Sequence, residues 1–152
     1  MKFKGLFLPI LALIVILGGS SCKKKTTPES FLEVKEFNAA TTLKWHQKFL
    51  EIERYADGMR PIPAPRALAY IGLAAYEVCI PGMPAYNSFK GKYYGLNLPT
   101  AETGKAIHWP SALNACYKDL YLKFLTDNKQ TPEGLVALKM PFSQYINEFA
   151  AT

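Results

Sequence analysis

Few side chains in this sequence are of the types that do acid–base or metal chemistry, and those few are far apart. His46 and His108 are the only histidines, and neither lies at a metal-binding spacing such as His-x-x-x-His. We therefore expect a solvent-facing His46 and a His108 at the entry to a helix, with no ligand role for either. Glu51 and Glu53 flank one helical position without facing each other, so they make no carboxylate pair by themselves.

The arginines offer a second kind of chemistry, the binding of an anion. Arg54, Arg60 and Arg66 are spaced six residues apart across a helix end and a proline-rich turn, which disfavours their convergence on one anion. The sequence has neither a glycine-rich phosphate loop nor a Gly-x-Ser-x-Gly motif. We therefore assign no catalytic, cofactor-binding or metal-binding residue.

Cys22 follows a pattern that predicts covalent lipid attachment. Lys2 and Lys4 precede the apolar run from Leu6 to Leu17, and the small residues Gly18 to Ser21 lead directly into Cys22. This order is typical of a secretory signal, and a cysteine after Gly-Ser-Ser looks like the site at which bacteria acylate and cleave lipoproteins. We expect residues 1–21 to be a lipoprotein signal peptide and Cys22 to be the lipidated first residue of the mature protein.

The location that follows is a bacterial membrane, outside the cytoplasm. The uncharged stretch 5–21 is short against the roughly 20 residues of a membrane-spanning helix, so a permanent transmembrane anchor is the weaker interpretation. Residues 22–30 are polar and suit a tether, and the run Ser-Cys-Lys-Lys-Lys resembles lipoprotein starts of Bacteroidetes-type bacteria. We expect a lipoprotein on the periplasmic or cell-surface side, with the outer membrane favoured.

The charge of the chain does not point to nucleic acid. The formal net charge is +6, but five of the 18 basic residues lie in the signal and tether, which leaves 13 basic residues against the 12 acidic residues of the whole chain. Lys23 to Lys25 could touch anionic headgroups, although a solubilising spacer is preferred. Cys79 and Cys116 could form a disulfide outside the cytoplasm, but their apolar helical contexts favour buried free thiols.

The first strong helical pattern runs from residue 42 to 56. Its apolar residues recur at helical spacing and form one stripe, whereas Lys44, Lys48 and Glu51 are expected to face the other way. Gly58 is placed for a left-handed cap after this helix. The stripe consists of Trp45, Phe49, Ile52 and Ala56.

A second helix is predicted from Pro65 to Cys79. It is apolar nearly all round, so we expect it at the centre of a helical bundle. Its only charges, Arg66 and Glu77, share one face with Tyr70. Because an unpaired charge in such a helix would be costly, we interpret both as structural residues with buried polar partners.

The rest of the chain predicts two more helical segments and a long loop. Residues 81–105 contain glycines, prolines and interleaved aromatic residues typical of an ordered loop packed by its own side chains. A helix from Trp109 to Leu125 and a final pattern starting at Thr131 follow, the latter kinked or split at Pro141. No strand alternation appears, so we predict an all-α domain over 31–152, a partial bundle of about four helices.

A resemblance to a known family rests on the residues from Trp45 to Val78. The string W-x-x-x-x-L-E-I-E-R-Y-A-D-G-M-R-P-I-P-A-P-R-A-L-A-Y-I-G-L-A-A-Y-E-V, then P-G-M-P-A-Y and I-H-W-P-x-x-x-N-A-C-Y, resembles the amino-terminal helical region of vanadium-dependent haloperoxidase-like proteins. These belong to the type 2 phosphatidic acid phosphatase superfamily. The resemblance covers roughly residues 42–125.

What the family implies is a helical bundle with a pocket for phosphate or vanadate. Its pattern has a Lys seven residues before an Arg-Pro, a later Pro-Ser-Gly-His, and a Ser-Arg with a downstream His. Here Glu53 stands seven residues before Arg60-Pro61, and neither Ser-Gly-His nor Ser-Arg occurs. The vanadate or phosphate site is therefore expected only outside this chain.

Two functional interpretations remain open. In the first, the chain is the non-catalytic amino-terminal half of such a lipoprotein, inactive alone and able to associate with itself or with a catalytic half. In the second, it is a free-standing helical lipoprotein that acts as a binding or scaffold module. The relatives of the first interpretation would be phosphatases or haloperoxidases.

Overall fold

The computed structural model describes residues 33–99, 106–126 and 129–152. The predicted signal peptide, the lipidation site Cys22 and the polar tether lie outside the described residues. Within those three ranges, no helix is both long and apolar enough to span a bilayer.

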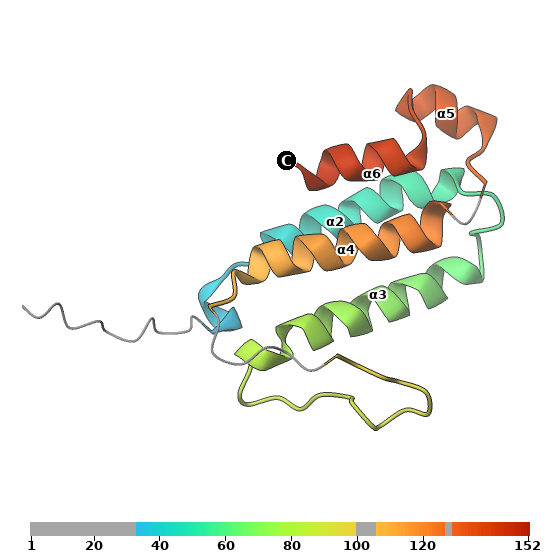
Figure 1. Ribbon diagram of the computed structural model, residues 1–152. Helices are drawn as coiled ribbons and strands as arrows, with labels where there is room; N and C mark the ends of the chain where they lie inside the picture. Colours follow the sequence, from blue (N-terminus) through green and yellow to red (C-terminus); the bar gives the residue numbers. More distant parts are fainter. Residues whose placement is uncertain (1–32, 100–105, 127–128) are drawn as a thin grey trace, which may run out of the picture. The chain divides into compact units, whose positions relative to one another are not determined.

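The described residues form helices and connecting segments without a strand, which confirms the predicted all-α class. The elements follow one another in the chain, with short 3-10 helices between or beside the α-helices (Figure 1). Their bounds are η1 Val34–Glu36, α2 Ala40–Ile52, η2 Glu53–Tyr55, α3 Pro63–Cys79, η3 Ile80–Gly82, α4 Trp109–Thr126, α5 Pro132–Leu138 and α6 Phe142–Ala150.

Two of the helices differ from their predicted bounds: α2 spans Ala40–Ile52 instead of residues 42–56, with a 3-10 helix after it, and α3 begins at Pro63 instead of Pro65. The expected left-handed residue after the first helix is present, since Gly58 has φ +72°. Thr131 caps α5, because its hydroxyl accepts a hydrogen bond of 3.1 Å from the backbone N–H of Gly134. Lys139 then adopts φ 58° and Pro141 precedes α6, so the last helical pattern is split as expected.

Helix α4 lies at the centre of the packing. It packs against α2, α3 and α6, and Figure 1 shows it beside all three. Trp45 and Phe49 of α2 meet Tyr121 of α4 edge to face, with ring centroids 4.8 and 5.6 Å apart, and Tyr117 stacks near Trp45 at 6.0 Å. These large rings, all at most 1% exposed, fill the space between the helices.

The expectation that the helix ending at Cys79 is central was wrong. Helix α3 packs mainly on α4, and its buried stripe is narrow and made largely of small side chains. Tyr70 of α3 is 54% exposed, and Ile62, directly before the helix, is 74% exposed. The apolar composition of α3 allows it to be buried all round but does not determine which helix is central. In the structure α2 and α6 pack on α4 rather than on α3. The buried stripe of α3 consists of Ala67, Ile71, Ala75 and Cys79.

The loop after α3 is partly packed by its own aromatic rings, as expected. Phe89 lies 5.4 Å from Tyr76 of α3 and 5.7 Å from Tyr93, and the Tyr76 hydroxyl donates to the carbonyl of Asn87 at 2.9 Å. Tyr94, by contrast, is fully exposed. These contacts therefore anchor the middle of the described part of the loop to α3.

Candidate functional site

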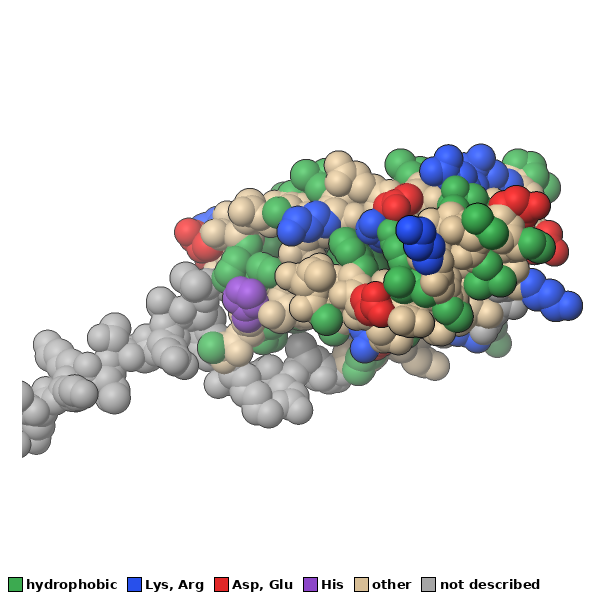
Figure 2. Space-filling model, turned by 90° about the horizontal axis from the view of Figure 1, so that it is seen from above, with side chains coloured by type: hydrophobic (Ala, Val, Ile, Leu, Met, Phe, Trp, Pro, Cys, Tyr) green, Lys and Arg blue, Asp and Glu red, His purple; other side chains and the backbone are tan. Residues whose placement is uncertain are grey.

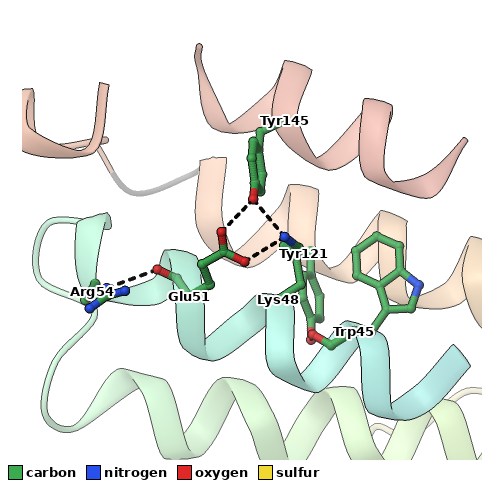
Figure 3. Close-up of polar contacts among 6 residues, drawn as sticks. All are labelled: Trp45, Lys48, Glu51, Arg54, Tyr121 and Tyr145. Atoms are coloured by element: carbon green, nitrogen blue, oxygen red, sulfur yellow. Dashed lines mark hydrogen bonds and ion pairs between the residues drawn. The ribbon is translucent and has the colours of Figure 1, made fainter. Parts of the chain in front are cut away.

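A triangle of polar side chains joins α2 to α6 (Figure 3). Lys48 Nζ lies 2.6 Å from Glu51 Oε2 and donates to the Tyr145 hydroxyl at 2.8 Å, and that hydroxyl donates to Glu51 Oε1 at 2.9 Å. The ammonium also lies 5.0 Å from the ring centre of Tyr145 and 5.1 Å from that of Phe149. Lys48 was expected to face solvent, but these residues of α6 leave its side chain only 20% exposed.

Electrostatics keep this triangle ionised. Partial burial lowers the pKa of Lys48, but its hydrogen bonds to Glu51 and Tyr145 outweigh burial and raise the pKa above its ordinary value. The hydrogen bond from Lys48 is the main cause of the lowered pKa of Glu51. A charged ammonium paired with a carboxylate is neither a nucleophile nor a base, so the triangle acts as a tie between two helices.

A buried hydrogen-bonded chain lies beside this triangle. The Tyr121 hydroxyl donates to the carbonyl of Trp45 at 2.6 Å, and the indole N–H of Trp45 donates to Asn114 Oδ1 at 2.8 Å. The amide of Asn114 in turn donates to the carbonyl of Ala150 at 2.8 Å. Burial is the main cause of the raised pKa of Tyr121, so its hydroxyl stays a neutral donor. These hydrogen bonds therefore link α2, α4 and α6.

Glu53 and Arg60 form a pair that sequence reasoning missed. Glu53 is 3% exposed, and Arg60 Nε lies 2.9 Å from both of its carboxylate oxygens while the terminal Nη2 also donates to Oε1. The turn at Gly58 brings these two residues together across seven positions. The carboxylate of Glu53 therefore binds the guanidinium of Arg60, which would otherwise be available to an anion.

The three arginines do not converge, as the sequence indicated. Arg54 Nε donates to the carbonyl of Glu51 at 3.2 Å, and its guanidinium lies 5.2 Å from the ring centre of Tyr55. Arg66 is exposed, and its side chain makes no hydrogen bond or ion pair with the described residues. The buried partner expected for Arg66 is therefore not found in this part of the chain.

Glu77 has the polar partners that were expected. Its Oε2 accepts from the Ser88 hydroxyl at 2.7 Å, and its Oε1 accepts from the backbone N–H of Phe89 at 2.6 Å. Glu77 thus fastens the long loop to α3.

The two histidines contact different residues of the fold. His46 is half-buried rather than solvent-facing, with Nδ1 2.8 Å from the carbonyl of Thr42 and its ring against Tyr117. His108, one residue before α4 begins, is exposed, and its Nδ1 lies 2.7 Å from Ser111 Oγ. Among the residues that the structure describes, no group of three His, Cys, Asp or Glu side chains could hold a metal ion.

Two apolar pockets flank α3. One, of about 400 Å³, opens toward α2, and the other, of about 560 Å³, opens toward the long loop. The first pocket reaches the buried stripe of α3 itself at Ala75 and Cys79, whereas helical spacing places the α3 residues of the second pocket to the other side of that stripe. The first pocket is lined on α3 by Gly72, Ala75, Tyr76 and Cys79, and the second by Ala74, Glu77 and Val78.

Apolar side chains are also distributed over the face seen in Figure 2, among scattered charges of both signs. Among the described residues, α3 is a largely apolar helix that lines an apolar pocket on each side, and Ala69 and Tyr70 are exposed on it. Comparison with known proteins finds no matching family, no matching curated protein and no matching solved structure.

Proposed function

We propose that this chain is a non-catalytic helical module of a membrane-anchored lipoprotein, related to the amino-terminal region of vanadium-dependent haloperoxidase-like proteins. In this proposal the module binds further helices through α3. Those helices come from a catalytic half in the superfamily interpretation, and any phosphate or vanadate site belongs to them.

The observation that carries the proposal is the surface of α3. Exposed residues here include Ala69 and Tyr70 of the helix and Ile62 directly before it, and an apolar pocket lies along each edge. Exposed apolar surface of this kind is typical of an interface, because covering it removes apolar area from water. Side chains from a neighbouring helix would enter the two hollows.

The polar clusters support a structural role for the module. The charged groups in two clusters bind each other within the bundle. One cluster is the triangle of Lys48, Glu51 and Tyr145, and the other is the pair of Glu53 and Arg60. Catalysis by phosphoryl transfer or halide oxidation needs several cationic donors directed at one anion. The resemblance from Trp45 to Val78 supports the proposed family, and the Gly-Ser-Ser-Cys order supports the proposed lipid anchor.

The activity test uses the full chain in detergent. We expect no turnover of a phosphomonoester, and no halide oxidation with vanadate and peroxide, above a buffer control. Turnover that survives purification and disappears in Arg60→Ala or Arg66→Ala would refute the non-catalytic assignment.

The association test compares two substitutions of exposed apolar residues. Ala69→Glu places a charge on the outer side of α3, whereas Val136→Glu places the same charge on α5, where Val136 is 78% exposed. We expect sedimentation in detergent to show self-association that Ala69→Glu weakens and Val136→Glu leaves unchanged. Equal effects of both substitutions would contradict the assignment of α3 as the binding surface.

A free-standing binding or scaffold module is the second candidate, and the same surface of α3 favours it. The downstream genomic sequence separates the two candidates, because a Pro-Ser-Gly-His motif there supports the haloperoxidase-like assignment. The anchor has its own test. Mass spectrometry of the detergent-extracted protein should show a diacylated or triacylated Cys22, and an unmodified chain beginning at Met1 would contradict the lipoprotein assignment.

A further inference from the structure

The two cysteines of the described residues lie on helices that pack directly against each other. Cys79 ends α3 and is 7% exposed, and Cys116 is half-buried in the middle of α4. Both thiols are free. Figure 1 shows α3 and α4 side by side and running in opposite directions.

An aromatic stack fixes the register of the two helices. Tyr70 of α3 stacks on Phe124 of α4, with ring centroids 6.2 Å apart and an angle of 8° between the planes. Each residue of an α-helix rises by about 1.5 Å along the axis, and the two helices run in opposite directions. The residue nine positions after Tyr70 on α3 therefore lies at the same height as the residue nine positions before Phe124 on α4. Nine positions forward is Cys79, and nine positions back is residue 115, directly before Cys116.

The two cysteines also point into the same interface. Cys79 continues the buried stripe of α3, one turn beyond Ala75. Cys116 is two turns before Phe124 on α4 and shares the side of α4 that meets α3. Alanines lie one turn before each cysteine, at Ala75 and Ala112, and small residues allow two helices to approach closely.

Helix geometry then places the two backbones within reach of a disulfide. Packed helices have axes about 8–10 Å apart, and each Cα lies about 2.3 Å from its axis, so facing Cα atoms are roughly 3.5–5.5 Å apart. Disulfides span Cα separations of about 4.4–6.8 Å. The electrostatics agree with this proximity, since burial, the charge of Asp119 and that of a Cys79 thiolate together raise the pKa of Cys116 to about 11.

We propose that Cys79 and Cys116 are a thiol pair that an oxidising disulfide, such as oxidised glutathione or a protein disulfide, converts into a covalent link between α3 and α4. The half-buried Cys116 sulfur loses its proton, attacks the oxidant and releases the first thiolate, which leaves a mixed disulfide. Cys79 then loses its proton and attacks the Cys116 sulfur, which expels the second thiolate. The protein gives up two protons and two electrons, and the oxidant is reduced to two thiols.

The consequence is a protein with two states of different rigidity. In the reduced state no bond joins Cys79 to Cys116, and in the oxidised state the disulfide closes the chain between them around the long loop. Closing a loop of this length restricts the unfolded chain, so the oxidised state should melt roughly 10 °C higher. The raised pKa values of both thiols keep the thiolate fraction small near neutral pH, so formation of the bond is slow there and faster at higher pH.

The test uses the full chain in detergent with Cys22→Ser, which leaves only these two thiols. The protein is equilibrated with mixtures of oxidised and reduced glutathione, the remaining thiols are alkylated, and intact mass and peptide maps are recorded. We expect a species that has lost two hydrogens, a crosslinked peptide containing Cys79 and Cys116, and a higher melting temperature. Monomers that carry only mixed disulfides with glutathione, or that stay fully alkylated, would overturn the proposal.

A matched variant distinguishes the bond from general effects of oxidation. Cys79→Ala in the same background leaves Cys116 alone and replaces one small apolar side chain with another. Oxidation of this variant should give at most one glutathione adduct and no rise in melting temperature. An equal rise in this variant would show that the bond is not the cause and would contradict the proposal.

Discussion

Gly82 is the last residue of η3. Trp109 of α4 and Val34 of η1 leave no space there for a side chain. A Cβ atom built on Gly82 would lie 2.3 Å from Trp109 Cζ2, 2.6 Å from Trp109 Cε2 and 2.9 Å from Val34 Cγ2. Gly82 has no positive φ, so an alanine there can adopt the backbone conformation and its effect is purely steric. Gly72, in the middle of α3, is the matched control because a Cβ there meets nothing within 4 Å.

The two substitutions should have opposite signs. Gly82→Ala forces the rigid, 4% exposed ring of Trp109 to move, and overpacking of this kind costs about 1–3 kcal/mol. Reduced freedom of the unfolded chain returns about 0.4–1 kcal/mol, so we expect a net loss of about 1–2 kcal/mol. Gly72→Ala carries no clash and gains helix propensity, so we expect it to stabilise the fold by about 0.5–1 kcal/mol.

Urea unfolding followed by circular dichroism measures both changes. For Gly82→Ala the urea midpoint should fall by roughly 1 M, and for Gly72→Ala it should rise by a few tenths of that. Tryptophan fluorescence provides a second signal, because the perturbed contact is with Trp109. If Gly82→Ala proved as stable as Gly72→Ala, the close approach of η3 to the start of α4 would be wrong.

Three further changes test other contacts. Glu77→Ala removes the acceptor that fastens the long loop, so limited trypsin digestion should cut 83–99 faster than in the wild type, and equal rates would count against the tie. The pKa of Glu51 is lowered in the fold, so its contribution is present above its ordinary pKa of 4.5 and is lost as pH falls through the lower folded pKa; Glu51→Gln should therefore lower the urea midpoint more at pH 7 than at pH 3. Tyr121→Phe should cost about 1 kcal/mol in the same unfolding assay, and an unchanged midpoint would contradict a stabilising hydroxyl.

Local features of this fold could be predicted because they depend on neighbours in the sequence. Gly58 supplies the left-handed residue and Pro141 separates α5 from α6, each through its own backbone preferences. The stripe beginning at Trp45 also became the buried side of α2. Periodicity and turn residues were enough for these predictions.

Contacts between distant residues were beyond such reasoning. The pairing of Glu53 with Arg60 depends on the path of the turn, and nothing in the residue types distinguishes it from two exposed charges. Lys48 gained its partner Tyr145 from α6, nearly a hundred residues later. The predicted centre of the bundle was wrong for the same reason, since apolar composition says how much of a helix can be covered but not by which neighbours.

The aromatic core also bears on the order in which this protein can fold during synthesis. Trp45 contacts Tyr117 and Tyr121 of α4 and the ring of Phe149 in α6, which lies 4.7 Å away. The ribosome adds residues one by one, so α2 emerges long before the rings that cover it, and contacts of such sequence separation form slowly. Until Phe149 has emerged, Trp45 and its neighbours lack part of their cover, and a chaperone or export factor would find them exposed.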